Sequence, residues 1–349
     1  MTTPISATTP TSVTIRPAVP ADYPALVAIQ HRALAEPAGT PILPMSVDDL
    51  ERYDREREPH IRLGRWVAAM DGQIAGWAEH DQTAHRYHPR KFWLDGYVDP
   101  AFQGRGIGAA LYDTVMEALR PHKPLAVRNA VREDFTGAIA FLERRGWAAA
   151  SRTWVSTLDV AAFDPAPYTA IAAAVRASGT EIKTLPELAD DPDHERKLYD
   201  LVWEIRQDLP DLDEATKEPF EVWRKERLHH PEIPAEGYFV ALHAGHYVGL
   251  LYHRDEPHEP GVLRIGQLGV SREYRGRHIA TALKLHGNAY ARARGFATLA
   301  TTNDSRNAPV LAINERMGFA RKPGYFHLLK TFGDGERGEG RERSEGEWV

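Results

Sequence analysis

The sequence predicts a mixed α/β fold that is present twice in one chain. Its 349 residues correspond to two domains of ordinary size. Two blocks of sequence also return 172 residues further along: Val98–Leu111 returns as Val270–Leu283, and Ala140–Trp147 returns as Ala312–Phe319. A single offset shared by two separate blocks indicates a duplication, because chance matches do not keep one spacing.

The first copy alternates strands with helices. Trp66–Met70 and Gln73–His80 alternate apolar and polar residues around Asp71-Gly72, which is typical of a tight hairpin. An apolar stripe from Ile107 to Leu119 predicts a helix. The predicted strands are Val13–Arg16, Trp66–Met70, Gln73–His80, Phe92–Val98, Leu125–Val131 and Thr153–Leu158. The predicted helices are Ala21–Leu34, Ile107–Leu119 and Gly137–Arg145.

The second copy repeats this order. Its predicted strands are Tyr238–Leu242, Tyr247–His253, Leu263–Val270, Ala297–Thr302 and Tyr325–Thr331. Its predicted helices are Asp193–Gln207, His278–Arg294 and Pro309–Met317. We therefore expect domains at 13–160 and 180–332, joined by a connector at 161–179 that contains an Ala-rich helix. The ends, 1–12 and 333–349, are poor in apolar residues and are expected to be disordered.

Composition excludes several classes of protein. The net charge of −6 gives no basic footprint for nucleic acid or an anionic membrane. The absence of cysteine excludes disulfides, thiolate nucleophiles and zinc sites built on sulfur. His85-x-x-His88 and His229-His230 lack a third ligand at a defined spacing, so no metal is expected. The N-terminus has no signal-peptide pattern, and a soluble cytoplasmic protein is the expectation. Its oligomeric state is left open.

The repeated block contains a turn between a strand and a helix, and this turn can bind an anion. The N–H groups at a helix N-terminus lack intrahelical partners, and glycines allow a pyrophosphate to approach them. The first turn comprises Gln103, Gly104, Arg105, Gly106, Ile107 and Gly108, and the second comprises Arg275, Gly276, Arg277, His278, Ile279 and Ala280. A P-loop is excluded because neither turn ends in Lys-Ser or Lys-Thr. A dinucleotide fingerprint is met only weakly, since His278 breaks it in the second copy.

With their flanking residues, the two turns resemble the acetyl-CoA-binding signature of the GNAT superfamily of acyl-CoA N-acyltransferases. The flanking residues that carry the resemblance are Val98-Asp-Pro100 and Gly146-Trp147 in the first half, and Val270, Asn307 and Gly318-Phe319 in the second. The resemblance covers about Val13 to Phe332, with His278 as a departure from the usual glycine. The tandem arrangement is similar to that of mycothiol synthase, although no residue singles out that substrate.

The resemblance implies two tandem GNAT folds, each a mixed, centrally splayed β-sheet flanked by helices. It implies that the pantetheine arm of acetyl-CoA lies between two splayed strands and bonds to backbone near Val98 or Val270. The pyrophosphate would rest on the amides of either turn. The acceptor would be a small-molecule amine, which attacks the thioester directly.

Candidate catalytic groups are few. A carboxylate base is implied near the third or fourth strand, and Glu79 and Asp95 lie there in the first half. His253, on the corresponding hairpin of the second half, is a second candidate base. Exposed carboxylates and a structural histidine remain the alternatives. The tyrosine that often protonates the leaving thiolate in this family is replaced by Leu142 and Asn314.

The two halves differ in what they keep. The first half has the better glycine turn but carries Phe135 where the family has a cofactor-contacting Asn, and the second half keeps Asn307. We expect the first half to bind acetyl-CoA at least as tightly as the second. The predicted function is N-acetyl transfer with one catalytic and one degenerate half. The alternative is a non-catalytic acyl-CoA-binding or sensing protein.

Overall fold

The computed structural model describes residues 13–34, 45–257 and 259–333. The ends that the sequence predicts to be disordered, apart from Gly333, lie outside the described residues.

In the described residues, the first half contains six strands and four helices, three of which were expected from the sequence. Its strands are β1 (Thr14–Pro17), β2 (Gly64–Met70), β3 (Gln73–Asp81), β4 (Lys91–Val98), β5 (Ala126–Arg132) and β6 (Ala148–Asp159). Its helices are α1 (Tyr23–Leu34), α2 (Val47–Glu56), α3 (Ile107–Leu119) and α4 (Thr136–Glu143). The sequence prediction missed α2, although Ser46 and Asp49 form a capping box at its start.

The second half repeats these elements, mostly at the offset of 172 residues. Its strands are β7 (Thr180–Thr184), β8 (Tyr238–His243), β9 (His246–Asp255), β10 (Val262–Val270), β11 (Thr298–Asp304) and β12 (Ala320–Thr331). Its helices are α6 (His194–Gln207), α7 (Phe220–Trp223), α8 (Ile279–Ala293) and α9 (Ala308–Arg316), and α5 (Thr169–Ala177) lies in the connector. The sequence prediction missed β7 and α7.

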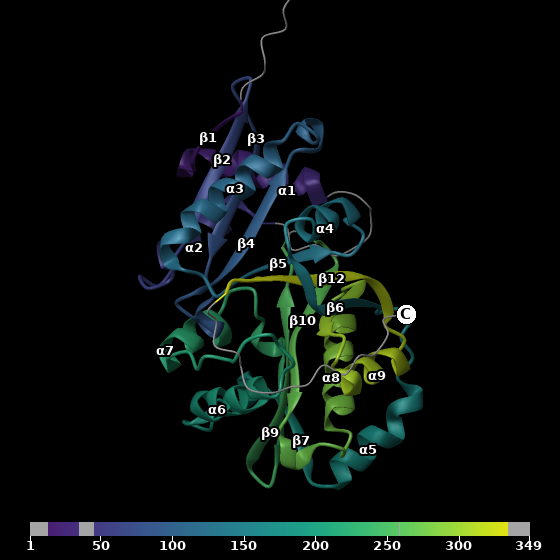
Figure 1. Cartoon of the computed structure of the whole chain (residues 1–349). Helices are drawn as coiled ribbons and strands as arrows, with labels where there is room; N and C mark the ends of the chain where they lie inside the picture. The colour runs from purple at the N-terminus through teal and green to yellow at the C-terminus, as the bar shows by residue number, and fades with distance from the viewer. Residues whose placement is uncertain (1–12, 35–44, 258, 334–349) are drawn as a thin grey trace, which may run out of the picture.

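The twelve strands in the described part of the chain form one continuous sheet, in the order β1-β2-β3-β4-β5-β12-β6-β11-β10-β9-β8-β7. The two closing strands are exchanged between the halves. β12 of the second half pairs with β5 of the first, and β6 of the first half pairs with β11 of the second. Figure 1 shows β12 in yellow, running beside β5 and β6 between the two halves.

The exchange mixes the two hydrophobic cores. Leu328, on β12, is 1% exposed and packs in the core of the first half with Phe92. Leu158, on β6, belongs to the core of the second half together with Leu283 and Val175 of the connector helix. Each half therefore buries apolar side chains supplied by the other.

Each half has one parallel pair of strands at its centre, and the two strands of each pair separate after a short contact. β4 and β5 pair from Lys91 to Trp93, and β10 and β11 pair from Val262 to Arg264. Beyond these residues the two strands of each pair diverge, and each keeps only its outer neighbour in the sheet. This confirms the mixed, centrally splayed sheet expected from the sequence.

Candidate active site

The two predicted anion turns have the same backbone conformation. Gly104 and Gly106 have φ of +75° and +82°, and Gly276 and His278 have +77° and +60°. Gly106 and His278 immediately precede α3 and α8, and no side chain caps either helix. The uncapped N–H groups therefore remain available to an anion. The His278 side chain is exposed, so it leaves the helix end open despite the departure from glycine.

Side chains within the two turns make the same contacts. Gln103 donates to the carbonyl of Val98 at 3.2 Å, and Arg275 donates to that of Val270 at 3.1 Å. Arg105 and Arg277 each donate to a carbonyl four residues earlier. Both guanidinium groups also lie over a neighbouring ring, that of Phe102 or Tyr274. These contacts fix the shape of the turns and leave both arginine side chains largely in solvent.

Replacing Gly106 by Ala should destabilise the protein, whereas replacing Gly108 should not. A Cβ on Gly106 meets no atom within 4 Å, so the cost is that of forcing a left-handed backbone, about 1 kcal/mol. Gly108 lies inside α3, where its Cβ would make an ordinary contact 3.6 Å from Val98. Gly108→Ala should therefore add up to about 1 kcal/mol of helix propensity. Urea unfolding of both variants checks the opposite signs, and equal shifts would contradict them.

Asn307 and Phe135 occupy matched positions, directly before α9 and α4. The Asn307 amide makes no capping bond to its own helix. The Phe135 ring instead packs under the Arg132 guanidinium, 4.1 Å from the ring centre. The position before the helix is therefore polar in the second half and apolar in the first.

Glu79 and Asp95 lie directly opposite each other on β3 and β4. Asp95 is two residues beyond Trp93, where β4 leaves β5, so the pair lies beside the splay of the first half. Arg65 on β2 donates to Glu79 at 2.6 Å and to Asp54 at 3.3 Å. Asp81, one pleat further along β3, accepts from Tyr53 of α2 at 3.2 Å. Three carboxylates thus line the face of the sheet nearest α2.

These carboxyl groups are held less acidic than usual. Burial, followed by the neighbouring charge of Glu79, raises the pKa of Asp95 to about 7 and that of Asp81 to about 7. Burial also raises the pKa of Glu79, against the opposing effect of Arg65. The Glu79 side chain remains 16% exposed, so it can exchange a proton with water. A carboxylate whose pKa is raised above its ordinary value is a stronger base, which suits Glu79 to general base catalysis.

Asp95→Asn should stabilise the protein at pH 8 and leave its stability nearly unchanged at pH 4. The folded-state pKa of Asp95 is raised above the ordinary value of 3.8, so the folded state binds its proton more tightly. Stability is therefore lost as pH rises from about 4 to about 7. The substitution removes this loss, which we expect to be about 1–3 kcal/mol. Denaturant unfolding at both pH values measures it, with the exposed Glu117→Gln as control.

His253 is the other candidate base from the sequence. It lies on the opposite face of the sheet from the positions that match Glu79 and Asp95. It is fully buried, its Nδ1 lies 2.9 Å from the carbonyl of Gly237, and its ring stacks on Tyr290 of α8. Burial lowers its pKa to about 4. Its Nε2 has no hydrogen-bond partner among the described residues. The structure therefore separates His253 from the face that corresponds to Glu79 and Asp95, where the second half carries Tyr252 and Gln267.

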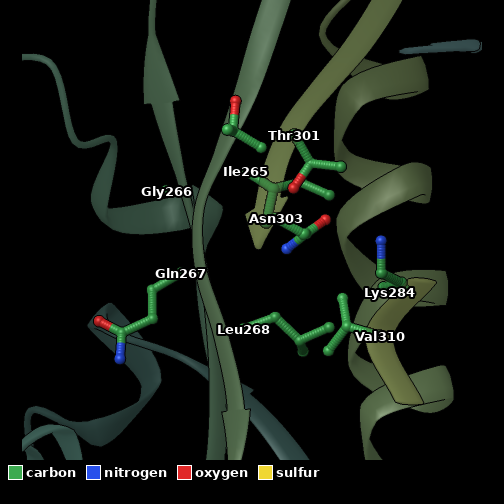
Figure 2. Close-up of a pocket in the computed structure, with 9 residues that line it drawn as sticks. Ile265, Gly266, Gln267, Leu268, Lys284, Thr301, Asn303 and Val310 are labelled. Atoms are coloured by element: carbon green, nitrogen blue, oxygen red, sulfur yellow. The ribbon is translucent and has the colours of Figure 1, made fainter. Parts of the chain in front are cut away.

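The cleft of the second half has a cavity volume of about 40 Å³ and is partly open to solvent. Gly266, Leu268, Thr301 and Asn303 line it from the two splayed strands, and Lys284 lines it from α8. Figure 2 shows Lys284 extending from the helix toward these strands, with Gln267 turned to the other side. The pairing of β10 with β9 skips Gly266, which forms a bulge in the cleft wall. β4 has no such interruption in its pairing with β3.

In the first half, where β4 and β5 separate, Asn129 of β5 donates to the carbonyl of Leu94 of β4 at 2.5 Å. The matched second-half residue is Thr301, whose shorter side chain leaves the corresponding point open. The positions of the usual proton-donating tyrosine are buried in both halves. Leu142 belongs to the first core, and Asn314 donates to Asn303 at 2.9 Å.

The repeated splayed sheet, with an uncapped helix end beside each cleft, defines a tandem acyl-CoA-binding fold. The Acetyltransferase (GNAT) family model matches the chain twice, over residues 30–147 and 196–319. These matches span more than half of the sequence, and the chain belongs to the GNAT family. It is an acyl-CoA N-acyltransferase of tandem architecture, as the sequence predicts, and its family uses acetyl-CoA as co-substrate.

Named relatives match most of this chain. A mycothiol acetyltransferase of Amycolatopsis mediterranei is 24% identical over 267 residues, covering 73% of this chain and 80% of the relative. One from Salinispora arenicola is 29% identical over 276 residues, covering 76% and 81%. Among solved structures, a tandem GNAT protein from the clavulanic acid biosynthesis pathway superposes with a TM-score of 0.68 at 20% identity, covering 92% of this chain and 98% of its own. A GCN5-related N-acetyltransferase from Sphaerobacter thermophilus gives 0.66 at 23% identity, covering 91% and 95%.

Two groups of polar residues in the clefts escaped the sequence reasoning. Asp81 lies two residues after Glu79 on β3, so both side chains lie on the same face of the strand. Two acids on one face of a central strand could have indicated this group from the sequence. Lys284 and Asn288 lie in the buried stripe of α8, four residues apart. Polar residues within an otherwise apolar helical stripe were the signal there.

Proposed function

We propose that the protein transfers an acetyl group from acetyl-CoA to a small-molecule amine, and that the first half carries out the chemistry. The observation that carries this proposal is the placement of Glu79 opposite Asp95 beside the splay of β4 and β5. In the second half the same two positions hold Tyr252 and Gln267, which carry no carboxylate. The second half is then the catalytically degenerate one.

Acetyl-CoA would bind with its pyrophosphate on the uncapped end of α3. A Cβ at Gly104 or Gly106 meets no atom within 4 Å, which leaves the approach to these amides clear. Gln103 holds the Val98 carbonyl, so the strand end keeps its shape beside the pantetheine. The second turn supports binding too, because its backbone has the same conformation. These features support one acyl-CoA site in each half.

The acidic face beside Glu79 would hold and deprotonate the amine. An alkylammonium ion is attracted to the three carboxylates, and it must lose a proton before its nitrogen can attack. Glu79 takes this proton, directly or through water, and the neutral amine then attacks the thioester carbon to form the C–N bond. The nitrogen releases a second proton to solvent as the tetrahedral intermediate collapses. The C–S bond breaks, and the coenzyme A thiolate takes a proton from solvent. Holding both substrates in line supplies much of the remaining acceleration.

Thiol release from acetyl-CoA over a panel of primary amines tests the proposed activity. Turnover with at least one amine supports it, and binding without any turnover contradicts it. The alternative, a protein that binds acyl-CoA without reacting it, is favoured by one observation. The tyrosine positions hold Leu142 and Asn314, neither of which can protonate a thiolate.

Calorimetry on two turn variants tests the expected order of affinities. Gly106→Trp blocks the first turn and His278→Trp the second. The first-half site should bind acetyl-CoA at least as tightly, so His278→Trp should retain a site of wild-type affinity. Loss of all binding in His278→Trp alone would contradict this expectation. Thermal melting of both variants controls for folding.

A further inference from the structure

The buried faces of α8 and α9 carry polar residues where the matched positions of the first half are apolar or internally satisfied. Lys284 occupies the position of Tyr112, whose hydroxyl accepts from the indole N–H of Trp147 at 3.1 Å. Asn288 occupies the position of Met116, and Asn314 that of Leu142. The first half shows that this fold needs no amine or amide at these sites. The requirements of the fold therefore do not account for these polar groups in the second half.

Several of these polar groups are buried without a partner. Lys284 is 1% exposed, and among the described residues its Nζ has no hydrogen-bond partner. Its contact is the ring of Phe319, 4.3 Å away. Both amide atoms of Asn288 and the Oδ1 of Asn314 are unpaired in the same way. Of these residues, Lys284 lines the cleft. Because an unpaired buried polar group costs folding free energy, a ligand that pairs with Lys284 would offset that cost.

The groups that face the cleft are mainly donors. Asn314 donates to the Oδ1 of Asn303, which leaves the Asn303 amide N–H groups free to donate toward a ligand. Lys284 and the hydroxyl of Thr301 line the same space. The nine lining residues, all within the described part of the chain, include no acid. A cleft with a cation and amide donors, and without an acid, suits a ligand that only accepts hydrogen bonds.

We propose that the cleft between β10 and β11 is a carboxylate-binding site, in which Lys284 pairs with the terminal carboxylate of a dicarboxylic acyl chain carried by coenzyme A. The proposal rests on the proposed binding of acyl-CoA at the second turn. α8 begins at that turn and presents Lys284 five residues later, so one helix would hold both the pyrophosphate and the acyl end. A free dicarboxylate is the other source of the same group.

The state of Lys284 agrees with this pairing. Burial lowers the pKa of its amine to about 7, so the isolated ammonium is disfavoured inside the cleft. A bound carboxylate would supply the counter-charge that this buried cation lacks. The neighbouring titratable group is His253 on β9, whose own pKa is lowered to about 4 and which is therefore uncharged at neutral pH.

Calorimetry with succinyl-CoA, acetyl-CoA and succinate tests the proposal on the full-length protein. We expect a site in the wild type that binds succinyl-CoA at least about tenfold more tightly than acetyl-CoA, as removal of one partner from a buried charge pair implies. In Lys284→Met this preference should disappear while acetyl-CoA binding persists. Tyr112→Phe, at the matched position of the first half, should keep the preference. Thermal melting confirms that each variant is folded.

The outcomes separate the alternatives. Equal affinity for the two thioesters in the wild type, or a preference that survives in Lys284→Met, overturns the proposal and leaves the acetyl-transfer proposal intact. Succinate that binds alone and depends on Lys284 supports the carboxylate site with a free acid as its source. Failure of every CoA thioester to bind either half overturns the proposed function itself.

Discussion

Glu79→Gln should lower kcat for amine acetylation by about 10²–10⁴ and leave the affinity for acetyl-CoA unchanged. The amide keeps the size of the side chain but cannot take a proton from the amine, and general base catalysis contributes a factor of this order. The substitution lies on the acidic face, away from the uncapped end of α3, so donor binding should persist. Initial rates of thiol release, with calorimetry for acetyl-CoA, measure the two effects separately.

The matched control for Glu79→Gln is Tyr252→Phe. Tyr252 faces Gln267 in the second half as Glu79 faces Asp95 in the first. Loss of its hydroxyl should leave turnover unchanged if the chemistry belongs to the first half. A large loss of turnover in Tyr252→Phe, together with an active Glu79→Gln, would place the chemistry in the second half. Melting curves exclude unfolding, because Glu79 also pairs with the buried Arg65.

Leu328→Ala should destabilise the whole molecule by about 2–5 kcal/mol, although Leu328 belongs to the second half of the sequence. Its side chain is 1% exposed in the core of the first half, and truncation leaves a cavity there. Leu158→Ala should destabilise the molecule in the same way, because Leu158 belongs to the first half of the sequence and packs in the core of the second half. Because the sheet is continuous, we expect one cooperative transition in both variants.

Urea unfolding followed by two probes checks this expectation. Circular dichroism reports on all strands, and tryptophan fluorescence reports mainly on the surroundings of the buried Trp77, Trp147 and Trp223. The two probes should give the same midpoint. Thr331→Ala, at an exposed position of β12, serves as control and should change stability by less than about 0.5 kcal/mol. Two separate transitions, with only one of them shifted, would show that the halves unfold independently.

Much of the fold could be predicted from the sequence because the two copies of the repeated domain are recognisable in it. The offset of 172 residues aligned α3 with α8 and β5 with β11, and the glycine turns marked where both helices begin. The exchange of closing strands could not be predicted. β6 and β12 are copies of one strand and have a similar alternation of apolar and polar side chains. This alternation predicts which face of a strand is buried, but it does not predict which strand lies next to it.

The candidate site was predictable in part for a similar reason. Glu79 and Asp95 were recognisable as acids on adjacent strands, but their register, which brings them face to face, depends on the β3–β4 pairing. Lys284 could not be recognised from the sequence as a cleft residue. Helical periodicity places it among the buried positions of α8 but does not predict a cavity beside it. The bulge at Gly266 is likewise a property of two strands together.

The exchanged strands constrain how such a protein can evolve. A recombination or truncation that removed the second copy would also remove the strand between β5 and β6, and with it part of the first core. A copy that loses its chemistry is therefore retained as a structural partner of the active one. Under the proposed function, the cleft between β10 and β11 can carry polar residues such as Lys284 without disturbing β12, because β6 and β11 lie between them in the sheet. The shared sheet would then keep both copies in the chain even where their ligands differ.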